Sequence, residues 1–415
     1  MVKSVNSKVG RFVFLYLWVT YIIYLGLMLL RENPGNLEEW RTVIFLSFAS
    51  NAFYLGCKTV SINNSQIRIS KEKKIDNSKI LLALIALLVI NILYLGDLFT
   101  SRMATLSFDI GDNYVERLDA EVSSNSLWGQ LNTLTLPLRI ILITYCTLYY
   151  KQLNKVTRLF FLSFVVILVL GSLFKGMQVG VGNVLIYILV PLFFMMKRDN
   201  NLKKFRRFAL WGALIFVVFF VLSQLSRATA YDYQLDEKYS DNFLYDIFGR
   251  RIGGGLLTFL SYFSHGYRGL NYSLQLPFEW TYGYGGSRAL NEYLHQYLHL
   301  DSMYNFTYPL RVKAVFGYDC EMSWPTAFAW WASDFSFPGV VILLFFLGKL
   351  VCKVIKDSIN SYSVISISFL CQLAILVIFM PMNNQAFQAR DSLIATVVLF
   401  FLWVINRKKV ATRNI

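Results

Sequence analysis

The sequence predicts an all-helical membrane protein that crosses the bilayer about ten times and carries one large loop outside it. Composition is the first observation: 56% of the 415 residues are hydrophobic and 16% are charged, with a mean hydropathy of +0.47. A soluble globule of this size would need more polar surface. The second observation is that the apolar residues gather in runs of about 16 to 20, close to the roughly 20 that cross a bilayer as a helix.

These runs define ten predicted spans. The first follows Lys3, Lys8 and Arg11, and no small-residue cleavage site precedes Arg31, which is typical of an uncleaved anchor. In chain order the ten spans are residues 12–30, 41–57, 80–99, 131–150, 159–175, 183–196, 208–226, 337–355, 363–380 and 392–406. Because their number is even, both termini are expected on one side of the membrane.

The charge between the spans predicts the orientation. A set of short segments holds 24 of the 40 Lys and Arg residues and 4 of the 25 Asp and Glu residues: 1–11, 58–79, 151–158, 197–207, 353–362 and 407–415. Basic loops stay in the cytoplasm, so both termini are expected there and the large loop on the opposite face. These basic loops explain the net charge of +15, so no nucleic-acid partner is predicted.

Three regions follow from these spans: residues 1–226 with seven spans, the large loop 227–336, and residues 337–415 with three spans. The loop is expected to hold the active site. It contains all three histidines and eleven of the 25 acidic residues, with enough Tyr, Trp and Phe to bury surface and fold. A shorter outer segment, 100–130, is acidic and predicts a helix from Tyr114 to Val122.

Basic residues at the outer ends of the spans suit a phosphate ligand. Lys175 ends one span, Arg227 follows another, Arg250 and Arg251 precede three glycines, and Arg288 lies further along the loop. A guanidinium at headgroup depth is costly unless it reaches the surface or meets an anion. Its fork of donors fits the oxygens of a diphosphate. Any one of these residues could be an ordinary interfacial cation, whereas several that converge would favour a diphosphate site.

Four residues are the candidate bases for activating a sugar hydroxyl: Glu279, Asp319, Glu321 and His265. Glu279 and Glu321 have aromatic neighbours in the sequence, and apolar surroundings raise the pKa of a carboxyl group. The pKa of histidine is ordinarily near neutrality, which suits His265 to the same role. The sequence does not choose among the four.

A metal site is an alternative for part of the loop. Glu292, His295 and His299 would share one helix face at i, i+3 and i+7, a spacing that could ligate zinc. A solvated or substrate-facing helix face is the favoured interpretation, so no metal ion and no other cofactor is predicted.

Aromatic residues of the loop are candidates for sugar contact. Trp280, Tyr282, Trp324 and Trp331 stand among hydrogen-bonding side chains, and sugar rings offer apolar faces that pack on such rings. Trp and Tyr are equally typical of the membrane interface, so both interpretations stay open.

The stretch SWPTAFAWWASDFSFPGVVILLFFLG resembles the signature of bacterial oligosaccharide repeat-unit polymerases, the Wzy-type O-antigen and capsule polymerases. The similar positions are Thr326, Phe328, Trp331, Asp334, Phe335, Gly339 and Gly348. Arg227 resembles the arginine at which the long outer loop of these proteins often begins. The chain departs from the family at Phe337-Pro338, in having Lys175 where an arginine is usual, and in lacking a repeated Arg-x10-Gly signature.

The resemblance implies a GT-C-like fold and a metal-independent glycosyltransferase of the bacterial inner membrane. A hydroxyl of one undecaprenyl-diphosphate-linked oligosaccharide would attack the anomeric carbon of the growing chain at the periplasmic face and displace undecaprenyl diphosphate. The product would be O-antigen or capsular polysaccharide. Membrane lipid, a chain-length regulator and a flippase are the expected partners. The alternatives are an O-antigen ligase that uses lipid A core as acceptor, and a flippase or transporter of lipid-linked oligosaccharide.

Overall fold

The computed structural model describes residues 5–30, 39–60, 76–101, 110–113, 126–230, 239–321 and 323–412. The predicted helix Tyr114–Val122 lies outside them. The helices that coincide with the predicted spans are α1 (Val5–Leu29), α2 (Glu39–Lys58), α3 (Asn77–Thr100), α5 (Leu127–Leu134), α6 (Leu136–Leu148), α7 (Lys155–Phe174), α8 (Gln178–Arg198), α9 (Leu202–Ala230), α14 (Ala327–Ser361), α15 (Val364–Phe379) and α17 (Arg390–Thr412). The other helices are α10 (Phe243–Tyr262), α11 (Gly266–Ser273), α12 (Arg288–Leu298), α13 (Tyr308–Phe316) and α16 (Gln385–Gln388).

Each of the ten predicted spans coincides with helix, because in lipid every backbone N–H and C=O must be satisfied within its own segment. Within the described parts of the chain, six helices are long and apolar enough to cross a membrane, and the bent pair α5 and α6 would make a seventh. The chain is therefore a multi-pass helical membrane protein. The count of ten spans stays a prediction. α15, for example, has 16 residues and measures about 24 Å, less than the ~30 Å hydrocarbon core.

The boundaries of the predicted loop 227–336 differ from the structure at both ends. α9 continues to Ala230, and α14 begins at Ala327 and breaks only at Ser336, where φ is 60°. The aromatic run that was assigned to the loop is helical because Phe328 and its neighbours are buried in the core. The segment between α9 and α14 carries α10 to α13 and the short 3-10 helix Tyr304–Phe306.

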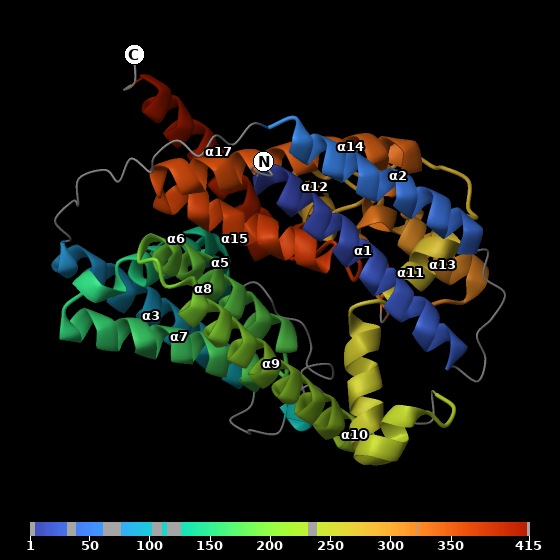
Figure 1. The fold of residues 1–415 in the computed structure, drawn as a ribbon, viewed down its shortest axis with the longest axis horizontal. Helices are drawn as coiled ribbons and strands as arrows, with labels where there is room; N and C mark the ends of the chain where they lie inside the picture. Colours follow the sequence, from blue (N-terminus) through green and yellow to red (C-terminus); the bar gives the residue numbers. More distant parts are fainter. Residues whose placement is uncertain are drawn as a thin grey trace.

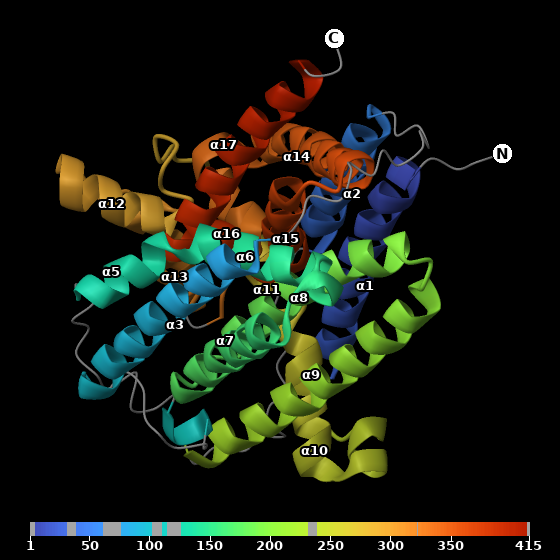
Figure 2. The ribbon, with the colours of Figure 1, turned by 90° about the vertical axis from the view of Figure 1, so that its left-hand side faces the viewer.

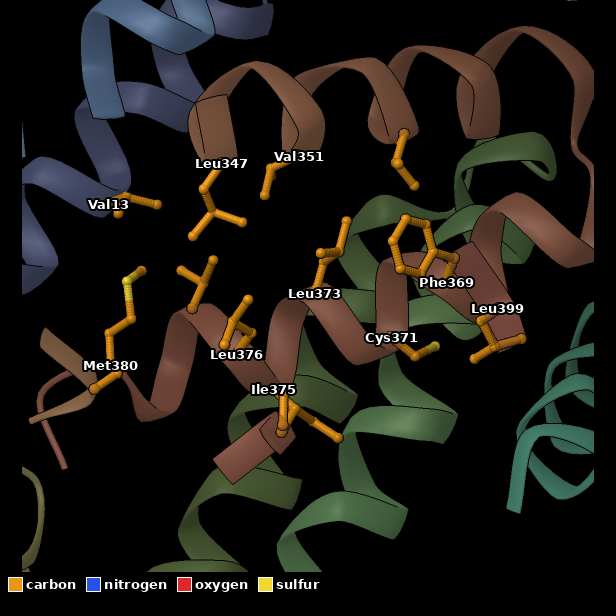
Figure 3. Close-up of a cluster of buried hydrophobic side chains, with 14 of the residues drawn as sticks. Val13, Leu347, Val351, Phe369, Cys371, Leu373, Ile375, Leu376, Met380 and Leu399 are labelled. Atoms are coloured by element: carbon orange, nitrogen blue, oxygen red, sulfur yellow. The ribbon is translucent and has the colours of Figure 1, made fainter. Parts of the chain in front are cut away.

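The helices form two groups that are joined by α15 and α17 (Figure 1). One group contains α1, α2 and α14, and the other contains α3 and α5 to α9. α15 contacts α14 of the first group and both α6 and α8 of the second. Figure 3 shows Leu347 and Val351 of α14 facing Leu373 and Leu376 of α15, within the hydrophobic core that holds the groups together.

Helices α2 and α14 pack closely because two glycines face the backbone of the partner helix. A Cβ on Gly56 would lie 1.9 Å from the carbonyl oxygen of Phe345, and one on Gly348 would lie 2.2 Å from that of Phe53. Small residues are the common means of close helix association in lipid, where van der Waals packing replaces the hydrophobic effect.

We predict that Gly348→Ala destabilises the protein by roughly 1–3 kcal/mol, because the added methyl group forces the two backbones apart. Gly96→Ala in α3 is the matched control, since a Cβ there meets nothing within 4 Å. Thermal unfolding of both variants in detergent measures the difference. Equal midpoints for the two variants would contradict the close α2–α14 contact.

Candidate functional site

A polar cavity lies among α3, α5, α6, α7 and α8, where they meet the start of α17. Its volume is about 130 Å³, several times the roughly 10–15 Å³ that one ordered water needs. Polar side chains that line it are Asn91, Tyr94, Asn132, Arg139, Ser172, Lys175, Asn183, Tyr187, Asp391 and Ser392. Ionisable residues inside a membrane bundle are costly, so their gathering around one cavity indicates a functional site.

Arg139 is the buried cation of this cavity. Pro137 stands in the first turn of α6, and a 49° bend separates α5 from α6, so Arg139 follows directly after a break in the span. Its guanidinium donates to Asn91 Oδ1 at 3.4 Å and to the carbonyl oxygen of Asn132. Nε is buried and has no hydrogen-bond partner among the described residues. An anion in the cavity would offset the cost of that buried donor, which is about 1–3 kcal/mol or more for a charged group.

Lys175 brings a second cation to the cavity from the end of α7. Its Nζ lies 5.5 Å from the centre of the Tyr94 ring, and the following Gly176 turns the chain with φ 62°. The guanidinium of Arg227, at the end of α9, donates to the carbonyl oxygen of Gly176. The structure therefore brings together two of the predicted diphosphate ligands, Lys175 and Arg227.

Residues 110–113 fix the ends of α7 and α9 in this arrangement. Asn113 is fully buried and its Nδ2 donates to the carbonyl oxygen of Leu173 at 3.1 Å. The backbone N–H of Gly111 donates to Ser226 Oγ at 2.6 Å. Both contacts lie within a few residues of Lys175 and Arg227, so they position the two cations relative to one another.

Asp391 is the carboxylate of the cavity. It stands in the first turn of α17, and its Oδ1 accepts a hydrogen bond from the backbone N–H of Ser392 at 2.7 Å. It also interacts electrostatically with Arg139. The cavity thus presents two cations and one carboxylate with several hydroxyl and amide groups, a set that suits an anion with many oxygens, such as a phosphate ester.

The other predicted cations lie elsewhere. Arg250 pairs with Asp241 at 2.6 Å on the surface, and Arg251 donates to Thr229 Oγ1 at 3.4 Å near the end of α9. Arg288 pairs with Glu292 at 2.9 Å on α12. Figures 1 and 2 both show α12 far from α10, so Arg288 does not converge with the arginines of α10.

The predicted bases are held by other groups outside the cavity. Glu279 pairs with Arg311 at 2.7 Å. Asp319 and Glu321 share Lys313 at 3.1 and 2.7 Å, and their hydrogen bonds raise the pKa of this lysine above its ordinary value.

His265 caps the start of α11, and its Nδ1 lies 3.0 Å from the carbonyl oxygen of Ser261. None of the four predicted bases lines the cavity that holds Lys175.

The predicted sugar-binding aromatics separate into exposed and buried rings. Trp280 and Tyr282 are about 60% exposed, at 58% and 60%, with ring centres 4.8 Å apart, and Trp324 is also exposed. Trp331 is 7% exposed and packs against Phe328 in the core. Its ring is therefore not available for sugar contact, because the early start of α14 turns it inward.

The predicted zinc spacing does not form a metal site. Glu292 is held by Arg288 and by Arg390 at 3.0 Å, and His295 Nδ1 lies 2.9 Å from the carbonyl oxygen of Leu300. His299 ends α12 in the left-handed conformation. Across the described ranges, no three His, Cys, Asp or Glu side chains lie close enough to hold a metal ion.

Asp334, the acid of the polymerase-like stretch, organises a turn. Its Oδ1 accepts hydrogen bonds from Thr281 Oγ1 at 2.5 Å and from the Gly285 N–H at 3.1 Å, and its Oδ2 accepts one from the Gly286 N–H at 2.9 Å. A Cβ on Gly286 would lie 2.5 Å from the Trp330 carbonyl oxygen. The carboxylate and the glycines therefore anchor the turn after Trp280 and Tyr282 to α14.

Sequence reasoning missed two ionisable residues of the cavity, Arg139 and Asp391. Arg139 stands inside the apolar run LPLRIILITYC, and an arginine within a span is itself a signal for a functional residue. Asp391 gave no such signal, because it lies in a short polar hairpin next to Arg390.

We predict that Asp334→Asn destabilises the protein by roughly 1–3 kcal/mol, because an amide N–H₂ group cannot accept the hydrogen bonds that both carboxylate oxygens accept. Asp301→Asn is the control, since Asp301 is exposed in the same segment. The readout is the thermal unfolding midpoint in detergent. If both variants unfold at the wild-type temperature, the carboxylate does not hold the turn.

Comparisons with protein-family models, with curated proteins and with solved structures find no match to this chain. Its function is therefore inferred from its own site.

Proposed function

We propose that the chain polymerises undecaprenyl-diphosphate-linked oligosaccharide units into O-antigen or capsular polysaccharide at the periplasmic face of the bacterial inner membrane. One observation carries the proposal: a polar cavity among apolar helices holds the buried Arg139, Lys175 and one carboxylate. The resemblance of the stretch around Asp334 to the Wzy-type polymerases, the charge bias between the spans and the helical multi-pass fold support it.

The cations suit the leaving group of this reaction. As the glycosidic carbon–oxygen bond to the carrier breaks, negative charge grows on the diphosphate, and fixed donors in a site that excludes water stabilise that charge. Arg139 can donate through its Nε–H, which has no hydrogen-bond partner among the described residues, and Lys175 through its ammonium group. Arg227 supports this site through its hydrogen bond to the Gly176 carbonyl oxygen. Lys175 and Asp391 lie at the C-terminal end of α7 and the start of α17, and a carrier lipid bound by its diphosphate at these helix ends would keep its tail in the hydrocarbon core.

Asp391 is the proposed base. The attacking hydroxyl of the acceptor unit forms the new bond to the anomeric carbon and gives its proton to the Asp391 carboxylate, while the electron pair of the broken bond leaves on the diphosphate. Glu279, Asp319 and Glu321 suit this role less, since each is already in an ion pair. Trp280, Tyr282 and Trp324 keep exposed rings that could contact the glycan.

A transporter or flippase of the same lipid-linked oligosaccharide is the second candidate. It is favoured by the burial of Arg139 beside Asp391, because transporters place ionisable residues within their spans. The two functions differ in product: a polymerase joins units in a sealed vesicle without moving them across, whereas a transporter moves them and leaves their length unchanged.

We predict that Arg139→Gln and Lys175→Gln each lower the polymerisation rate by about 10²–10³-fold, through loss of charge stabilisation at the diphosphate. Arg407→Gln, which breaks a pair with Asp357 at 3.4 Å near the C-terminal end of α17, is the control and retains the rate. The assay follows glycan length on a gel, with purified protein in vesicles that contain undecaprenyl-diphosphate oligosaccharide.

Unchanged ladders in both cavity variants would contradict the proposed diphosphate site. Long chains that form but fail to reach lipid A core in cells would identify a ligase.

We predict that Asp391→Asn lowers kcat about 10²–10⁴-fold with little change in the binding of the donor, because the proton acceptor is lost. Asp391→Glu restores part of the rate, since it keeps a carboxylate. Donor binding is measured by the shift that the undecaprenyl-diphosphate-linked oligosaccharide causes in the unfolding temperature. A rate for Asp391→Asn close to that of the wild type would remove Asp391 from the mechanism.

A further inference from the structure

Residues 243–248, the first part of α10, fold back on the rest of the helix. Gly249 interrupts the helix with φ 76° and ψ 157°, a conformation that glycine adopts readily. A Cβ on Gly253 would lie 2.7 Å from Tyr245 Cδ1 and 3.0 Å from the Leu244 carbonyl oxygen, so the two parts pack against one another. We name residues 243–252 the α10 tip.

The α10 tip exposes large apolar side chains. Phe243 and Ile247 are 64% and 65% exposed, and Phe248 and Ile252 are each 48% exposed. Removing such side chains from water is energetically favourable. A patch of four exposed apolar side chains within ten residues is therefore unfavourable in water and indicates an interaction surface.

Charged residues border this apolar patch. Arg250 is exposed and pairs with Asp241, and Arg251 is exposed beside Thr229. An apolar face next to arginines is the pattern of segments that lie in a membrane interface, where apolar side chains enter the acyl boundary and arginines meet anionic headgroups.

The tip lies beside the C-terminal ends of two helices of spanning length. The backbone N–H of Ser240 donates to the Leu30 carbonyl oxygen at 2.8 Å, at the end of α1. A Cβ on Gly255 would lie 2.9 Å from Val221 Cγ1 of α9. α10 thus joins the C-terminal ends of two helices that are long enough to cross a membrane, and Figure 2 shows it at the edge of the molecule.

The exposed surface of α9 is apolar, like this patch. Leu210, Leu214, Val218 and Leu222 are each at least half exposed and recur at every fourth residue, which makes one apolar stripe along the helix. Such a stripe on a helix of spanning length faces lipid. α10 packs against the same helix, so lipid is the occupant that the surroundings of the tip favour over a protein partner.

We propose that the α10 tip inserts into the lipid leaflet that meets the C-terminal ends of α1 and α9, with Phe243, Ile247, Phe248 and Ile252 among the acyl chains and Arg250 and Arg251 at the headgroups. The tip connects α1 of one helix group to α9 of the other. Its insertion therefore fixes both groups at one depth in the bilayer, independently of the reaction in the cavity.

The test is a nitroxide spin label on Ile247→Cys in the full chain, reconstituted in vesicles of phosphatidylethanolamine and phosphatidylglycerol. Collision with oxygen reports lipid, and collision with a water-soluble nickel complex reports water. We expect the label at 247 to meet oxygen several-fold more than nickel. Tyr297→Cys on α12 is the matched control, because Tyr297 is 63% exposed and Ile247 65%, and its label should prefer nickel.

All five native cysteines are buried, and labelling of the unaltered chain gives the background.

Two results would overturn the proposal. A label at 247 that prefers nickel lies in water, and one that meets neither reagent is covered by protein. Phe243→Ser with Phe248→Ser should move the 247 label toward water while the unfolding midpoint in detergent stays within a few degrees of wild type. If the double variant leaves the label in lipid, these two side chains do not anchor the tip.

Discussion

The apolar surroundings of the helices are the constraint on which the rest of the structure depends. In lipid, backbone polar groups are satisfied within helices, and charged side chains must turn inward or reach the surface. The outer face of α9 accordingly carries Leu210 and Val218, whereas Arg139 turns into the cavity. A buried charge must in turn be compensated by polar groups or a ligand. The polar cavity and the apolar exterior therefore follow from the same desolvation cost.

The three charged residues of the cavity stand at helix ends or just after a helix bend, while the rest of its lining reaches the middle of α3, α6 and α8. Lys175 follows the last turn of α7, Asp391 stands in the first turn of α17, and Arg139 comes directly after the bend between α5 and α6. Helix ends leave backbone groups unpaired and lie near the membrane surface, so a site made from them can hold a polar head whose lipid tail stays outside.

Ion pairs and hydrogen bonds distinguish the structural carboxylates of the segment between α9 and α14, and Asp334 at the start of α14, from the proposed base. Glu279 is held by Arg311, Asp319 and Glu321 by Lys313, and Asp334 by Thr281 and backbone amides. These contacts hold the segment between α9 and α14 together and, through Asp334, fix it on α14. Asp391 shares its cavity with two cations and open volume, which is the setting that proton exchange with a substrate requires.

The sequence by itself determined that the chain is a helical membrane protein and which residues form its long helices, because both depend on local apolar composition and on backbone hydrogen bonds within each segment. It also indicated that Lys175 and Arg227 stand at helix ends, because each directly follows a long apolar run. Only the tertiary structure decided that Arg227 contacts Gly176 next to Lys175, that Arg139 and Asp391 share the cavity of Lys175, and that Trp331 is buried. Lys175 and Asp391 lie 36 and 252 positions after Arg139 in the sequence, yet all three line one cavity. Such long-range contacts are set by helix packing, which local composition does not encode.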